Sequence, residues 1–155
     1  MIFATVGSQK FPFDRLLSAL DALQGEDIFA QTGSSTYIPR NYAFAPYLDR
    51  AAFTQKLSAA EIVITHGGTG AIMTAVKQGK KVIAVPRLAR YGEHVDDHQL
   101  QLVSQFAAQN LIFALEDCSE LSDAIRRIRG HQFQPYRSST QAIIRDLETY
   151  LERLQ

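Results

Sequence analysis

A strand–helix–strand unit in the middle of the sequence limits the fold of this chain most strongly. Residues 62–65 are a β-branched run too short for a helix, residues 71–78 follow as a helix that Gly79 ends, and a second apolar run at 82–85 stops at Pro86. Strands joined in this way run parallel, because parallel neighbours need a crossover connection. The unit therefore predicts an α/β fold built on a parallel sheet.

The same alternation of short apolar strands and amphipathic helices extends along the whole chain. We expect further strands at 2–6, 27–31, 42–45 and 111–113, and helices after Pro12, from about Asp49, around 100–107 and over 119–129. A final amphipathic helix is expected over about 138–154, with an apolar stripe of Ile143, Ile144, Leu147, Leu151 and Leu154. The predicted fold class is α/β, a Rossmann-like, mostly parallel sheet with helices on both faces, in a single domain over 1–155 whose core spans about 1–130.

Charge and cysteine content exclude several kinds of partner and site. Lysine plus arginine and aspartate plus glutamate each number 16, so no net positive charge attracts nucleic acid. The lone Cys118 can form neither an internal disulfide nor a cysteine-based zinc site, which fits a reducing compartment. No basic segment precedes a long apolar stretch at the N-terminus, and no run approaches the ~18 apolar residues of a membrane span. We therefore expect a cytoplasmic protein.

The loops that follow the strands are where a ligand is expected, because parallel sheets bind ligands beyond the carboxyl ends of their strands. The most informative loop is His66-Gly67-Gly68-Thr69-Gly70. Its glycines let the backbone approach a ligand, and the following helix offers unpaired N–H groups to a diphosphate. A tight strand-to-helix turn is the alternative reading. The chain lacks a G-K-[ST] sequence, a G-x-G-x-x-G fingerprint and a G-x-S-x-G elbow, which argues against a P-loop nucleotidase, a nicotinamide enzyme and an α/β-hydrolase.

A second polar cluster runs from Glu93 to Gln99, at the start of a predicted helix. Its side chains suit the hydroxyls of a sugar, although helix capping by Asp96 or Asp97 would explain the aspartates equally well. The histidines lie in one short loop without zinc-motif spacing, so no metal site is expected. Two arginines just before the cluster, Arg87 and Arg90, would neutralise a diphosphate, contact a partner, or belong to a solvated loop.

These two clusters together carry a family resemblance. The run HGGTGAIMTAVKQGKKVIAVPR, followed by YGEHVDDHQLQ, closely resembles the PssE/EpsF-type subunits of bacterial exopolysaccharide glycosyltransferases, which contain the glycosyltransferase family 28 C-terminal domain. It is also similar to the catalytic subunit of the eukaryotic two-part enzyme that adds the second N-acetylglucosamine to dolichol-diphosphate-linked sugar, and to the C-terminal half of MurG. The resemblance extends from the opening ATVGS to about Glu120.

The resemblance implies an enzyme, with one half of a GT-B glycosyltransferase as its fold. This half binds a UDP-sugar and transfers the sugar, with inversion, to a lipid-diphosphate-linked saccharide acceptor in exopolysaccharide or capsule biosynthesis. A separate membrane-associated, PssD/EpsE-like subunit would bind the acceptor and hold the chain at the inner face of the membrane. No cofactor or metal is implied. The alternative is a non-catalytic nucleotide-binding or regulatory subunit of a polysaccharide-synthesis complex.

The resemblance also assigns residues to the site. Gly67, Gly68, Thr69 and Gly70 would cradle the diphosphate with His66 beside them, and Asp97, His98 and Gln99 would contact the donor sugar, within the cluster that Glu93 begins. Gly7 and Ser8 would line the cleft facing the partner. Many relatives carry a ribose-binding glutamate where this chain has Thr74. A bulky residue at Gly68 is expected to abolish donor binding and leave the fold largely intact; no catalytic base is assigned.

Overall fold

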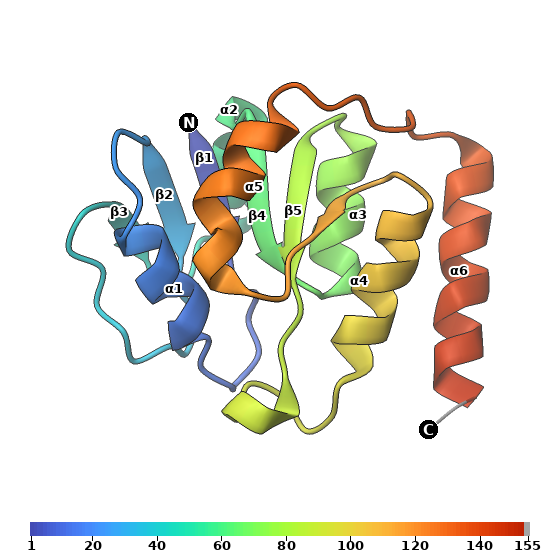
Figure 1. The fold of residues 1–155 in the computed structure, drawn as a ribbon, viewed down its shortest axis with the longest axis horizontal. Helices are drawn as coiled ribbons and strands as arrows, with labels where there is room; N and C mark the ends of the chain where they lie inside the picture. Colours follow the sequence, from blue (N-terminus) through green and yellow to red (C-terminus); the bar gives the residue numbers. More distant parts are fainter. Residues whose placement is uncertain (154–155) are drawn as a thin grey trace.

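The computed structural model describes residues 1–153, which contain one parallel sheet with helices on both faces (Figure 1). The sheet has six strands in the order β3-β2-β1-β4-β5-β6. Their bounds are β1 (Ile2–Thr5), β2 (Ile28–Gln31), β3 (Ala43–Ala45), β4 (Ile62–His66), β5 (Lys81–Val85) and β6 (Phe113–Ala114). Every pairing between neighbours is parallel, which confirms the predicted fold class.

Helices connect most of these strands. They are α1 (Asp14–Asp21), α2 (Arg50–Ala59), α3 (Thr69–Lys77), α4 (His98–Ala108), α5 (Leu121–Ile128) and α6 (Ser138–Arg153), with short 3-10 turns η1 (Ala89–Tyr91) and η2 (Cys118–Glu120). The last predicted strand is shifted. Leu111 and Ile112 are buried in the core, and only Phe113 and Ala114 pair with β5.

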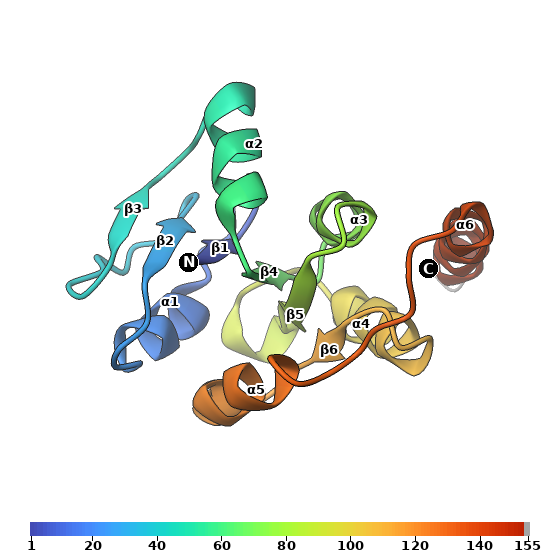
Figure 2. The ribbon, with the colours of Figure 1, turned by 90° about the horizontal axis from the view of Figure 1, so that it is seen from above.

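The alternating side chains of the strands build two cores, one on each face. Ile62 and Ile64 point to the face that α1 and α5 cover, while Val63 points to the face covered by α2, α3 and α4. Seen from above, the sheet lies between α1 and α5 on one side and α2 and α3 on the other (Figure 2). Both faces are apolar, as expected for parallel strands buried between helices.

The connection from β2 to β3 is a loop that lies along α1, without a helix of its own. Two carboxylates of α1 hold it: Asp14 accepts the backbone N–H groups of Thr36 and Tyr37, and Asp21 accepts those of Arg40 and Asn41. Asp21 is buried, and although burial alone would raise its pKa, these hydrogen bonds and that of the Tyr37 hydroxyl lower the pKa below its usual value. The loop is therefore an ordered part of the fold.

The C-terminal helix α6 lies beside α4, outside the sheet (Figure 1). The apolar stripe predicted for it, Ile143, Ile144, Leu147, Leu151 and Leu154, falls on residues whose side chains lie outside the described part of the structure. Within the described residues, no helix is both long enough and apolar enough to cross a membrane.

Candidate functional site

The candidate site lies at the carboxyl-terminal ends of the parallel strands, called the carboxyl edge of the sheet below, at the point where the strand order changes direction. β1 is the first strand in sequence, and its neighbours β2 and β4 extend the sheet to opposite sides. Such a switch point leaves a crevice between the loops after the central strands. The loops that end β1, β4 and β5 meet here, so the structure brings together the three segments that the sequence pointed to.

The amide of Gln99 joins two of these loops to α4. Its Oε1 accepts the backbone N–H of Gly67, after β4, and that of Arg87, after β5, both at 3.0 Å. Its Nε2 lies 3.3 Å from Nδ1 of His66. Gln99 is only 4% exposed. In the structure, the side chain of Gln99 is engaged in holding the N-terminal ends of α3 and α4 side by side. The predicted contact between Gln99 and a donor sugar stays a prediction.

The His66 imidazole lies at the centre of the carboxyl edge. Because Oε1 of Gln99 accepts two N–H groups, its Nε2 must face Nδ1 of His66, which makes Nδ1 the acceptor and leaves the ring proton on Nε2. Burial, assisted by the positive charge of Arg87, lowers the pKa of His66 to about 4. The ring is therefore a neutral hydrogen-bond donor at physiological pH.

Glycines on two loops make room for the His66 ring. A Cβ atom at Gly7 would lie 2.5 Å from Nε2, and one at Gly68 would lie 2.3 Å from Cε1. Gly67 is equally restricted, since a Cβ there would lie 2.8 Å from Cγ2 of Val103 on α4. The expectation that Gly68 can be replaced without disturbing the fold is therefore wrong. Packing alone requires these three glycines, in agreement with the reading of the loop as a tight turn.

Gly70 is different, and it lies in the first turn of α3. A Cβ atom at this glycine would meet no described atom within 4 Å. Gly68 is the N-cap, and no side chain of the described residues caps the helix. The first N–H groups of a helix lack partners within the helix, so this terminus presents donors and the positive end of the helix dipole at the carboxyl edge.

The remaining predicted contacts are distributed around this terminus. Thr69 begins α3, and Thr74 is exposed one turn later, where its hydroxyl donates to the carbonyl of Gly70 at 2.7 Å. Ser8 is exposed on the loop after β1. Asp97 and His98 lie at the start of α4. Asp97 holds the N-cap position without capping; its carboxylate accepts the N–H of Ala89, and Asp96 accepts that of His98 instead.

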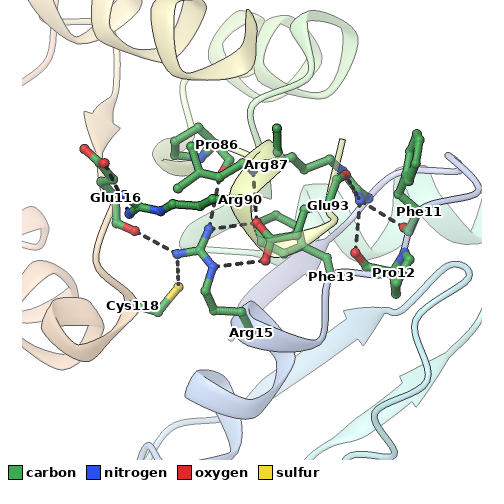
Figure 3. A network of polar contacts seen from close by, with 12 residues as sticks. Phe11, Pro12, Phe13, Arg15, Pro86, Arg87, Arg90, Glu93, Glu116 and Cys118 are labelled. Carbon is green, nitrogen blue, oxygen red and sulfur yellow. Dashed lines mark hydrogen bonds and ion pairs between the residues drawn. The ribbon is translucent and has the colours of Figure 1, made fainter. Parts of the chain in front are cut away.

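Glu93 is the buried partner of an ion pair with Arg15 (Figure 3). It is 3% exposed, and its two carboxylate oxygens accept Nε and Nη2 of Arg15, each at 3.0 Å. The predicted contact between Glu93 and the substrate remains a prediction, but the structure assigns its carboxylate to Arg15. The sequence offered no signal for Arg15 as its partner, because the two residues are 78 positions apart.

The burial of Arg87 excludes one of the three alternatives considered for it, because a fully buried side chain does not belong to a solvated loop. Its guanidinium donates to the backbone carbonyls of Phe11 and Glu93 (Figure 3). It also donates to the carbonyl of Val6 and thereby joins the loops after β1 and β5. Burial lowers the pKa of Arg87 to about 10, so it stays charged at neutral pH. Arg90 is exposed, and its guanidinium lies 3.7 Å from the carboxylate of Glu116.

Comparison with known protein families identifies the family of this chain. Residues 1–154 match the glycosyltransferase family 28 C-terminal domain. The chain belongs to this family. The match to family 28 covers the loop that ends β4 and the start of α4, and it therefore includes every predicted site residue.

Among individual proteins, the family 28 domain is 30% identical over 96 residues to a UDP-N-acetylglucosamine transferase subunit ALG13 of Candida glabrata. That similarity covers 61% of this chain and 43% of the relative, so less than half of the relative's length is matched. A second ALG13 subunit, of Eremothecium gossypii, is 32% identical over 79 residues, which are 50% of this chain and 37% of that relative.

Solved structures show the same fold. An NMR structure of ALG13 superposes with a TM-score of 0.60 at 16% identity and covers 89% of both chains. MurG of Acinetobacter baumannii superposes with a TM-score of 0.55 at 19% identity, over 94% of this chain and 49% of MurG. The family 28 domain described here therefore has the fold of about half of a MurG chain. The narrower resemblance to PssE/EpsF-type subunits remains a prediction.

Proposed function

We propose that this chain is the donor-binding and catalytic subunit of a two-component glycosyltransferase. It binds a UDP-sugar at the carboxyl edge and transfers the sugar to a lipid-diphosphate-linked saccharide acceptor. The observation that carries the proposal is the family 28 match over residues 1–154, together with an uncapped α3 terminus at the switch point of the sheet. Neither feature alone specifies a nucleotide sugar.

In this proposal, the diphosphate binds at the N-terminus of α3. Backbone N–H groups of Thr69 and Gly70 and the helix dipole suit an anion there. The neutral Nε2–H of His66 adds a donor that costs no extra buried charge. These donors also suit the departing UDP, whose negative charge grows as the glycosidic bond breaks, and they would act without a metal. Among the described residues, no group of three potential metal ligands is gathered at one place.

The donor sugar is placed beside α4, where Asp97 and His98 begin the helix next to the α3 terminus. The acceptor would approach from the opposite side of the carboxyl edge, past Ser8, on a second unit. That unit is a membrane-associated, PssD/EpsE-like subunit in this proposal, which holds the chain at the cytoplasmic face of the membrane. The ALG13 relatives are named as subunits of a transferase, which supports a partner. Exopolysaccharide or capsule synthesis is the process to which we assign it.

A charge placed at Gly70 tests the diphosphate site with opposite effects on folding and binding. We expect Gly70→Asp to keep or raise thermal stability, because a carboxylate in the first turn favours the helix dipole by about 0.3–1 kcal/mol. The same carboxylate repels a diphosphate, so the Kd for UDP in calorimetric titration should rise at least tenfold. A Cβ atom at Gly70 meets no described atom within 4 Å, so the substitution starts in open space.

Gly70→Asn is the matched control, since it has nearly the same shape and no charge. It should bind UDP far more tightly than Gly70→Asp does. Equal Kd values for UDP in the two variants would show that the diphosphate does not lie at the α3 terminus, and the proposed donor site would then be wrong.

A further inference from the structure

The segment that precedes α4, residues 87–97, is called the rim loop below, and two of its side chains fix it to the fold: the guanidinium of Arg87 and the carboxylate of Glu93. η1 is the only helical turn within it among the described residues. Leu88 accepts the N–H groups of Tyr91 and Glu93, both at 3.2 Å, and donates its own N–H to Oε1 of Glu93 at 3.1 Å. Glu93 therefore closes the first half of the rim loop on itself.

Arg15 fixes this closed turn to the rest of the molecule. It extends from α1, and its five N–H groups have five acceptors: two on the Glu93 carboxylate and one each on the Pro86 carbonyl, the Glu116 carbonyl and Sγ of Cys118. These acceptors belong to the rim loop, the end of β5 and the loop after β6 (Figure 3). One guanidinium thus sets the position of three segments against α1.

The rim loop is hydrogen-bonded directly to the Asp97 carboxylate. The N–H of Ala89, next to Leu88, donates to Oδ1 of Asp97 at 2.9 Å. A contiguous path of polar contacts therefore runs from Arg15 through Glu93 and Leu88 to the end of the rim loop, where α4 begins. Glu93 is buried and Arg15 is partly buried, so loss of Arg15 leaves an uncompensated buried carboxylate that is driven toward water.

We propose that Arg15 and Glu93 are positioning residues for the donor sugar: they hold the rim loop in the geometry that presents Asp97 and His98, without contacting the donor themselves. This inference rests on the proposed function, since it requires that the rim loop borders a UDP-sugar. Packing of α1 is separate from this role, because Leu16, Leu17 and Leu20 bury that helix against the sheet.

The test compares the binding of UDP with that of a UDP-sugar. Calorimetric titration of the purified chain with UDP and with UDP-N-acetylglucosamine, UDP-glucose and UDP-galactose gives the ratio of the Kd of the tightest UDP-sugar to the Kd of UDP. Arg15→Met should raise this ratio at least fivefold. The Kd of UDP itself should change less than twofold, because the α3 terminus is held by Gln99 rather than by Arg15. A loss of overall stability would not single out the sugar in this way.

Arg90→Met is the matched control. Arg90 lies in the same loop and carries the same charge, but its ion pair with Glu116 is exposed, so the ratio should stay within twofold of the wild-type value. The double variant Arg15→Met with Glu93→Gln removes both charges of the pair and should bring the ratio back toward that of the wild type. Hydrogen exchange of the Leu88 and Glu93 amides should quicken at least tenfold in Arg15→Met, while that of Ile72 in α3 stays unchanged.

Two results would overturn the inference. One is an unchanged ratio in Arg15→Met; should that variant fail to fold, an unchanged ratio in the folded Arg15→Lys variant, which keeps the charge and loses the fork, is equally decisive. The other is a raised ratio in Glu93→Gln but not in Arg15→Met, which would mean that Glu93 contacts the donor directly. A wild-type chain that binds neither UDP nor any UDP-sugar would instead refute the proposed function.

Discussion

The imidazole of His66 shows how one residue connects sequence, packing and chemistry at this site. It ends β4, and two glycines leave space for its ring. The amide of Gln99 fixes its tautomer. A histidine before a glycine-rich loop can be noticed in the sequence, but its partner Gln99 is 33 positions away and its neutral state depends on burial and on Arg87. The sequence therefore predicted its place and could not predict its protonation.

His66 makes the stability of the fold depend on pH. Its pKa falls from 6.5 to about 4 in the native state, so the unfolded chain binds more protons between these values. The contribution of neutral His66 to the free energy of unfolding is fully present above pH 6.5. It is lost as the pH falls toward 4, by up to about 3 kcal/mol. Urea unfolding between pH 4.5 and 7.5 should show a steeper loss for the wild type than for His66→Phe. Carboxylates contribute equally to both proteins, so parallel curves would contradict the assignment.

Glu93 and Arg87 illustrate where reasoning from the sequence stops at this scale. Both lie in a polar stretch that reads as a solvated, ligand-binding loop, yet both are buried. Their partners, Arg15 and the carbonyls after β1, come from a segment about 80 positions earlier. No local pattern encodes such a contact, because charged residues are buried only where tertiary structure supplies partners.

Among the elements, α4 has the most consequence for the site, because its first turn carries Gln99. This side chain accepts from the loops after β4 and β5 and so sets two strand ends against one helix. Its role could not be read from the sequence, where it belongs to a run of polar residues. Apart from the shifted last strand, the predicted elements themselves are confirmed: Asp49 caps α2 through the N–H of Ala52, and α3 ends before Gly79, which has a positive φ.

Replacing Gln99 tests this connection between elements. Gln99→Ala leaves the buried N–H groups of Gly67 and Arg87 without their acceptor, so the free energy of unfolding should fall by about 2–4 kcal/mol. Gln101→Ala, on the exposed side of the same helix, should change it by less than about 0.5 kcal/mol. Urea unfolding of the two variants checks this. Similar losses for both would mean that Gln99 does not hold the loops.

On the scale of the whole molecule, the parallel sheet followed from the strand–helix alternation, but its strand order did not. The right-handed crossover rule allows β4 to lie on either side of the early strands, and only packing puts β1 between β2 and β4. The helix-free connection between β2 and β3 was expected, but its attachment to α1 was not, because it depends on Asp14 and Asp21 accepting backbone N–H groups from a loop. Once the order is known, the switch point fixes the place of the ligand.

The most direct test of a UDP site at this edge is NMR mapping on the isotopically labelled chain. Addition of UDP, with ADP as the control nucleotide, should shift the amide resonances of Thr69, Gly70 and His98, at the N-terminal ends of α3 and α4. Amides at the opposite edge of the sheet, such as Gly79 and Gly130, should stay in place. Shifts that cluster at that opposite edge, or equal shifts with ADP, would contradict the account of this protein as a UDP-sugar-binding subunit.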